Sequence, residues 1–173
     1  MLNRRTMIQS LAALAALAAL GAALAQPDGK AEGPLPLIGS VLRVPAVTLL
    51  DGRPWTPSAV QGKVLVVYWW ASWCPFCALQ SPHIEALWRA QRASGLVEVL
   101  ALSIDSQPAA AVAYMKARAY SFPAAMVTPQ MAKVLPKPRG LPVVVVRGRG
   151  GKVVFAEAGE MFPEDVEGLK KYL

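Results

Sequence analysis

Residues 64–77 read VLVVYWWASWCPFC, a stretch that joins an apolar run to a pair of cysteines. Its first half, residues 64–70, is a continuous apolar run, the pattern of a strand that is buried on both faces. Apolar side chains recur at helical spacing after Pro75, so a helix is expected to begin there. Cys74 and Cys77, the only cysteines in the chain, therefore lie where a central strand ends and a helix begins. Backbone N–H groups and the helix dipole stabilise an anion at that point, and the anion here would be the Cys74 thiolate.

A pair of cysteines can form a structural disulfide, a metal site or a redox couple. A disulfide between Cys74 and Cys77 would close a very small loop and would therefore stabilise the fold little. Zinc requires a tetrahedral ligand set, and besides carboxylates the chain adds only one histidine, His83. We expect His83, directly after Pro82, to be a partly exposed helix residue, and we predict no metal site. Thiol–disulfide exchange is the use that remains.

Residues 1–25 have the pattern of an export signal. Paired arginines, Arg4 and Arg5, precede an uncharged run rich in Ala and Leu, which ends in an Ala-Leu-Ala cleavage pattern. Removal of this segment is favoured over an uncleaved membrane tether, and the paired arginines resemble a twin-arginine signal. The predicted location is the bacterial periplasm. Residues 26–40, rich in Pro and Gly, are expected to form a flexible leader.

Residues 41–173 are expected to form a single α/β domain. Strand-like and helical patterns alternate along it, followed by a hairpin and a closing helix, which predicts a sheet covered on both faces. Asp105 or Ser106 is expected to cap the helix that begins at Pro108. Besides residues 64–70, the expected strands are 41–50, 55–56, 97–104, 122–127, 143–146 and 152–156; the expected helices are 75–93, 108–119, 129–135 and 162–173.

The charge pattern favours a solvated surface over a nucleic-acid or membrane partner. The chain has 18 basic and 11 acidic residues, a net charge of +7 at pH 7. The basic residues are scattered along the sequence, and no RNA- or DNA-binding motif accompanies them. We therefore predict no nucleic-acid partner.

The order of these elements, with Trp-Cys-x-x-Cys after the first central strand, resembles the thioredoxin fold. Gly140-Leu141-Pro142, directly before a valine strand, matches the proline motif of that fold. Residues 41–62, 71–77 and 122–135 resemble the TlpA/ResA-like thiol–disulfide oxidoreductases in particular. The resemblance implies a central mixed sheet with helices on both faces, an N-terminal β extension and a central strand–helix insertion.

The same resemblance implies roles for individual residues. Cys74 would be the exposed nucleophile, and Cys77, buried one turn later, the resolving cysteine. No cofactor is implied beyond the redox-active disulfide between these two. The residues expected to bind substrate are Trp73, Pro75, Phe76, Leu141 and Pro142, the last with a cis peptide bond.

Two residues depart from the family's pattern near the second cysteine. Tyr68 stands where thioredoxins have a buried aspartate, and Gln80 where ResA-like reductases have a glutamate. Glu85 lies about two helical turns from Cys77, too far to act on it directly. No side-chain base for Cys77 is therefore evident. A peroxidase function is rejected, because the residues before Cys74 lack the proline that peroxiredoxins require.

The predicted function is that of a periplasmic thiol–disulfide oxidoreductase, more specifically a reductase of protein disulfides. Its expected partners are protein thiols and disulfides of the envelope, with a membrane thiol reductant as electron donor, and the resemblance suggests cytochrome c maturation. It is expected to act as a monomer. One alternative is a thioredoxin-fold module that binds and delivers a soft metal such as Cu(I). The other is an interaction domain whose disulfide never turns over.

Overall fold

The computed structural model describes residues 32–173. The predicted export signal and the first residues of the predicted leader lie outside the described residues. Five strands form the central mixed sheet, in the order β6-β5-β4-β8-β9. Strand β4 runs parallel to β5 and antiparallel to β8, which pairs with β9 in turn. The strands are β4 (Val64–Trp70), β5 (Val97–Ser103), β6 (Ala124–Met126), β8 (Val143–Arg147) and β9 (Val153–Ala158).

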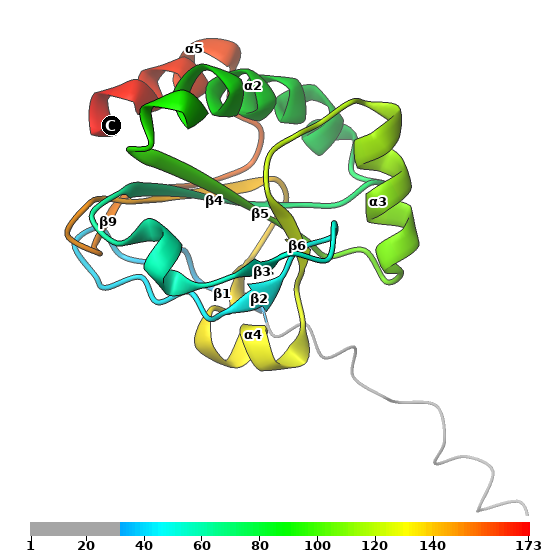
Figure 1. Ribbon diagram of the computed structural model, residues 1–173, viewed down its shortest axis with the longest axis horizontal. Helices are drawn as coiled ribbons and strands as arrows, with labels where there is room; N and C mark the ends of the chain where they lie inside the picture. The colour runs from blue at the N-terminus through cyan, green and yellow to red at the C-terminus, as the bar shows by residue number, and fades with distance from the viewer. Residues whose placement is uncertain (1–31) are drawn as a thin grey trace, which may run out of the picture.

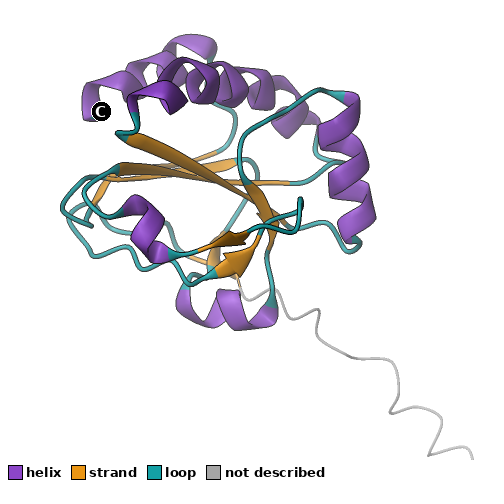
Figure 2. Cartoon of the chain, viewed as in Figure 1, coloured by secondary structure: helices purple, strands orange, loops and turns teal. Residues whose placement is uncertain are grey.

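Helices lie on opposite sides of this sheet. Figure 1 shows α2 and α5 side by side on one side and α4 on the other, and Figure 2 shows the strands running between them. Each of the four described α-helices begins with a proline, which fits the first helical position because its missing N–H would have no partner there. The helices are α2 (Pro75–Gln91), α3 (Pro108–Ala117), α4 (Pro129–Val134) and α5 (Pro163–Gly168), with 3-10 segments η1 (Pro57–Val60), η2 (Arg92–Ser94) and η3 (Leu169–Tyr172).

Strand β4 is the centre of the core. All seven of its residues are fully buried, as the uninterrupted apolar run predicts. Trp70 at its end packs against Tyr114 of α3, with ring centroids 5.6 Å apart. Because β4 ends at Trp70, a fully buried central strand carries the short segment that presents Cys74.

Two short strand pairs lie outside the main sheet. Strands β2 (Val47–Thr48) and β3 (Pro54–Trp55) form a hairpin, so the strand expected over residues 41–50 is much shorter than predicted. A tight turn at Asp51-Gly52 joins them, and Gly52 adopts a positive φ of 86° there. Strands β1 (Glu32–Gly33) and β7 (Lys137–Pro138) pair in parallel. The β2–β3 pair lies within the predicted N-terminal β extension, whereas the predicted central strand–helix insertion corresponds to β6 and α4.

Two local predictions were wrong. Residues 32–40 are not a flexible leader: β1 pairs with β7, and the Gly39 N–H donates to the Val153 carbonyl at 2.8 Å. Asp105 does not cap α3, whose N-cap is Gln107 without a side-chain hydrogen bond. In both cases contacts with distant residues override the local pattern. Among residues 32–173, no helix is both long and apolar enough to cross a lipid bilayer.

Candidate active site

Cys74 is the N-cap residue of α2. Its Sγ accepts a hydrogen bond from the Cys77 backbone N–H at 3.2 Å, in the position that a capping oxygen usually takes. Pro75 follows as the first helical residue, and both cysteines are free thiols. The helix N-terminus therefore points a backbone donor at the sulfur that would carry the negative charge. This is the geometry that the sequence predicts for a reactive thiolate.

Cys74 is more buried than expected. Its residue exposure is 4%, against 0% for Cys77, so the prediction of an exposed nucleophile was wrong in degree. Its remaining access is to a hollow of about 330 Å³. The hollow is lined by Glu32, Trp73, Cys74, Pro75, Phe76, Ile104, Lys137, Gly140 and Leu141. A partner must enter this hollow, because Cys74 is not on the open surface.

The structure gathers most of the predicted substrate-binding residues around Cys74. Trp73, Pro75, Phe76 and Leu141 all line the hollow, and Trp73 and Phe76 are exposed. The Leu141–Pro142 peptide bond is cis, as expected. Pro142 itself is buried and does not line the hollow. The apolar rim thus comes from both the cysteine motif and the loop before β8.

A buried lysine beside the hollow was missed by sequence reasoning. Lys137 is 3% exposed, and its Nζ donates to a Glu32 carboxylate oxygen at 2.7 Å. It also donates to the carbonyls of Pro138 at 2.6 Å and Gly140 at 2.9 Å. A buried ammonium requires such partners, because its desolvation is otherwise strongly unfavourable. No sequence signal separates this lysine from the scattered surface ones.

Asp105 supports the turn that carries Cys74. It follows β5, is 5% exposed, and accepts hydrogen bonds from the Ser72 N–H at 3.1 Å and the Ser72 hydroxyl at 2.7 Å. The Ser103 hydroxyl donates to the same carboxylate at 2.7 Å. Ser72 stands two residues before Cys74, so this carboxylate ties the end of β4 to the end of β5. The sequence pattern predicts a different role for Asp105, as a cap of the helix that begins at Pro108.

The Tyr68 side chain contacts the backbone of Cys77, the predicted resolving cysteine. Its hydroxyl lies 2.9 Å from the Ser81 Oγ and donates to the Cys77 carbonyl at 3.4 Å, and the Ser81 hydroxyl donates to the same carbonyl at 2.7 Å. Burial raises the pKa of the Cys77 thiol, and the Cys74 sulfur raises it further. Hydrogen bonds from the Ala71 backbone and from the Tyr68 hydroxyl oppose this rise. Burial also raises the pKa of Tyr68 well above its ordinary value, so its hydroxyl keeps its proton.

Neither Gln80 nor Glu85 provides Cys77 with a base. Gln80 is fully buried; its Oε1 accepts the Met161 N–H at 2.8 Å, and its Nε2 has no hydrogen-bond partner among the described residues. Glu85 instead accepts the Ser121 N–H at 2.8 Å and the Ser121 hydroxyl at 2.7 Å. The expectation that Glu85 is not a base for Cys77 is therefore consistent with its contacts.

His83 is half-buried on α2, as predicted, and lies at a hollow between α2 and α5. Within residues 32–173, no three His, Cys, Asp or Glu side chains come together in a way that could hold a metal ion.

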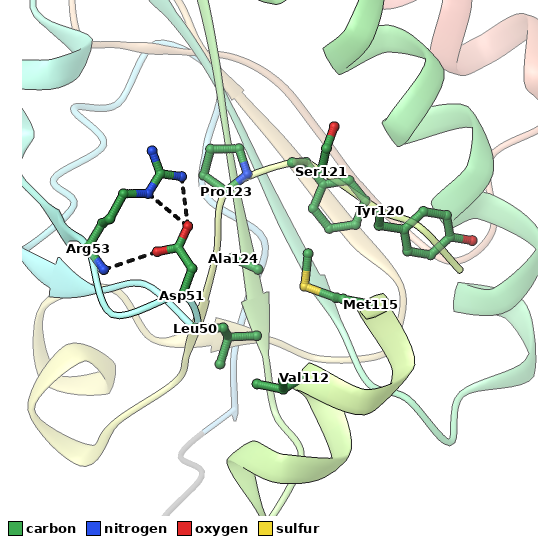
Figure 3. A pocket seen from close by; sticks show the side chains of 10 residues that line it. Leu50, Asp51, Arg53, Val112, Met115, Tyr120, Ser121, Pro123 and Ala124 are labelled. Carbon is green, nitrogen blue, oxygen red and sulfur yellow. Dashed lines mark hydrogen bonds and ion pairs between the residues drawn. The ribbon is translucent and has the colours of Figure 1, made fainter. Parts of the chain in front are cut away.

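A second hollow, of about 260 Å³, lies at the edge of the sheet beside β6 (Figure 3). Residues 121–124, which lead into the edge strand β6, form one wall, whereas Cys74 follows β4, which is separated from β6 by β5. Val112 and Met115 of α3 contribute apolar side chains. Arg53 and Asp51 form an exposed ion pair at 2.7 Å beside them. No thiol lines this hollow, so the redox chemistry belongs to the hollow at Cys74.

A thioredoxin-type sheet, a dithiol at the N-terminus of a helix and a cis-proline before β8 define a thiol–disulfide oxidoreductase of the thioredoxin superfamily. The profile of the Redoxin family matches residues 41–173, and the chain belongs to this family. It is a TlpA/ResA-like member of the superfamily and a protein-disulfide oxidoreductase.

Named relatives agree with this assignment. The thiol-disulfide oxidoreductase ResA of Bacillus thuringiensis is 28% identical over 125 residues, which cover 72% of each chain. The soluble secreted antigen MPT53 of Mycobacterium tuberculosis is 40% identical over 38 residues, 22% of each chain.

Solved structures show the same fold. A thioredoxin-family thiol:disulfide interchange protein from Chlorobium tepidum superposes with a TM-score of 0.71 at 20% identity, covering 79% of this chain and 97% of that one. A secreted disulfide oxidoreductase of Mycobacterium tuberculosis gives a TM-score of 0.63 at 20% identity, covering 74% and 95%.

Proposed function

We propose that the protein is exported to the periplasm and reduces disulfides of other envelope proteins, with Cys74 as nucleophile and Cys77 as resolving cysteine. One observation carries this proposal. The Cys74 Sγ accepts the Cys77 N–H at the N-terminus of α2 and opens into a hollow with an apolar rim. A thiolate held in this way can attack a disulfide that enters the hollow.

The reaction would proceed in two exchanges. The Cys74 thiolate attacks one sulfur of a substrate disulfide, and the other substrate sulfur leaves as a thiolate and takes up a proton. Cys77 then loses its proton and attacks the Cys74 sulfur, which breaks the mixed disulfide and releases the second substrate thiol. The substrate disulfide gains two electrons and two protons, and the Cys74–Cys77 disulfide forms. This disulfide is the only cofactor that the proposal requires.

The direction of electron flow is inferred from the motif. Pro75 and Phe76, the residues between the cysteines, carry no charge that would stabilise the thiolate and make the pair a strong oxidant. A membrane thiol reductant would restore the dithiol after each turnover. Export is supported by the signal pattern of residues 1–25 and by the similarity to a secreted antigen of Mycobacterium tuberculosis. The paired arginines favour the twin-arginine route. The protein would act as a monomer.

Trapping in the native host tests the function. Cys77→Ala removes the resolving thiol, so mixed disulfides on Cys74 should accumulate as adducts on non-reducing electrophoresis and disappear with dithiothreitol. Cys74→Ala is the matched control and should trap nothing. The identities of the adducts would name the substrates and the electron donor, including any cytochrome c maturation protein. An absence of adducts, while Cys74 still reacts with a thiol reagent, would overturn the proposal.

A second measurement tests direction and location. Acid quenching followed by alkylation of free thiols reports the redox state of the pair inside the cell. A periplasmic reductase should be found mainly as the dithiol in a periplasmic extract. A pair that is mainly disulfide would refute the reductase direction, and recovery from the cytoplasm would refute export.

A further inference from the structure

The hollow at Cys74 is lined by two charged side chains, and they are bound to each other. Lys137 and Glu32 form an ion pair of 2.7 Å, with side-chain exposures of 4% and 42%. The other lining residues are apolar, or a cysteine, or glycine. The positive charge beside the nucleophile is therefore compensated within the hollow itself.

Lys137 has no donor to spare for a substrate. An ammonium carries three N–H groups, and its Nζ contacts Glu32 and the carbonyls of Pro138 and Gly140. The Gly140 carbonyl directly precedes Leu141, whose side chain lines the same hollow. Lys137 thus holds the loop that forms one wall, while Glu32 on β1 cancels its charge.

We propose that the Lys137–Glu32 pair sets the charge selectivity of the active site. Lys137 is a positioning residue for the Gly140–Pro142 loop, and Glu32 keeps the hollow electrically neutral. The hollow then favours a substrate whose cysteine is flanked by uncharged, apolar side chains that pack on Trp73 and Leu141. This inference rests on the proposed function, because it concerns which disulfides reach Cys74.

The physical argument is electrostatic. Unpaired charge in a partly desolvated cleft attracts or repels a charged ligand more strongly than it would in water. If Glu32 lost its charge, the ammonium of Lys137 would remain beside Cys74 without compensation. Anionic disulfides would then be drawn to the nucleophile and cationic ones repelled, as charge complementarity predicts for encounter rates.

The test compares two small disulfides of opposite charge. Reduced protein is mixed with dithiobis(nitrobenzoate), a dianion, or with cystamine, a dication, and acid-quenched time points are counted by intact-mass spectrometry. The variant is Glu32→Gln, which keeps an oxygen acceptor for Lys137 but removes the charge. The ratio of the anionic to the cationic rate should rise about fivefold or more at low salt and fall back as salt is added.

Glu167→Gln is the matched control. Glu167 forms a Lys ion pair of the same length with Lys170, but both side chains are exposed and neither lines the hollow. Its rate ratio should equal that of the wild type. Lys137→Met supplies a second arm: with Glu32 left unpaired, the ratio should fall below the wild-type value, and a thermal melt shows whether this variant is folded.

The outcomes separate the two levels of the proposal. A wild-type protein that reacts with neither probe would refute the oxidoreductase function itself. A wild-type protein that reacts normally, with an unchanged ratio in folded Glu32→Gln, would refute the charge-selectivity inference and leave the function standing.

Discussion

The Tyr68 hydroxyl should speed the second exchange, and Tyr68→Phe isolates its contribution. In the wild type this hydroxyl lies 2.9 Å from the Ser81 Oγ and donates to the Cys77 carbonyl at 3.4 Å. It also opposes the rise in the pKa of the Cys77 thiol that burial causes. The ring stays in place in Tyr68→Phe, so only the hydroxyl and its hydrogen bonds are lost.

The magnitude follows from one buried hydrogen bond. Such a bond contributes about 1 kcal/mol net, which corresponds to about a fivefold change in an equilibrium constant. Without the hydroxyl the pKa of Cys77 should rise further, so less thiolate exists at neutral pH. The more basic thiolate is also the better nucleophile, which offsets about half of this loss, so resolution of the mixed disulfide on Cys74 should slow by about two- to threefold at pH 7. Below the pKa of Cys77 the rate should still rise about tenfold per pH unit in both proteins, because the thiolate fraction does.

Stopped-flow release of nitrothiobenzoate measures the step directly. The first equivalent reports attack by Cys74 on dithiobis(nitrobenzoate), and the second reports attack by Cys77 on the mixed disulfide. Only the second phase should slow in Tyr68→Phe. Tyr172→Phe is the control, since the Tyr172 ring packs against Phe155 of β9, with ring centroids 5.9 Å apart. Equal second phases in Tyr68→Phe and wild type, at every pH, would show that the hydroxyl does not act on Cys77.

Four further predictions concern the same helix. Gln80→Glu should raise the rate of resolution at neutral pH about tenfold, because a carboxylate can accept the Cys77 proton and still accept the Met161 N–H; an unchanged second phase in stopped flow would contradict this. Glu85→Ala should lower the free energy of unfolding by about 3 kcal/mol in urea titrations, since two Ser121 donors lose their acceptor. Burial raises the pKa of Glu85, but hydrogen bonds from Ser121 outweigh it and lower the pKa overall. The difference in unfolding free energy between wild type and Glu85→Gln should therefore narrow as the pH falls below 4.5, because the carboxylate becomes protonated. A difference that does not change with pH would refute this reasoning. The pKa of Cys77 is raised above its ordinary value of 9.0, so the contribution of the buried thiol to stability is complete below pH 9.0 and is lost at higher pH. Above pH 9.0 the unfolding free energy of the reduced wild type should fall more steeply than that of Cys77→Ala. Parallel plots of unfolding free energy against pH would contradict this.

The parts of the fold that could be predicted are those set by neighbouring residues. A short unbroken apolar run that ends before a cysteine and proline motif favours a strand buried on both faces, and residues 64–70 are one. Pro75 and Pro108 mark helix starts because a proline fits that position without losing a hydrogen bond. The cis bond before Pro142 was also expected from a short motif.

What could not be predicted depends on residues far apart in the chain. The Lys137–Glu32 contact joins residues separated by 105 positions, through two strands of two residues each. No periodicity can be read from strands so short, so residues 32–40 look like a flexible leader in the sequence. Aspartate is a common helix-cap residue, but the Asp105 carboxylate instead accepts a hydrogen bond from the hydroxyl of Ser72, 33 residues earlier in the chain. The burial of Cys74 likewise depends on residues far away in the chain, such as Glu32 and Lys137, which line the same hollow.

The active site thus depends on supports that the cysteine motif does not contain. Asp105 holds the turn before Cys74, Lys137 holds the loop opposite it, and Tyr68 approaches Cys77 from the central strand. Each support comes from a different strand or strand end, whereas both reactive sulfurs belong to one helical turn. Related chains could therefore keep the motif and its chemistry while they change which disulfides are accepted and how fast they are released. For this chain, selectivity and resolution should be separable by mutation: Glu32 acts on the first exchange, and Tyr68 on the second.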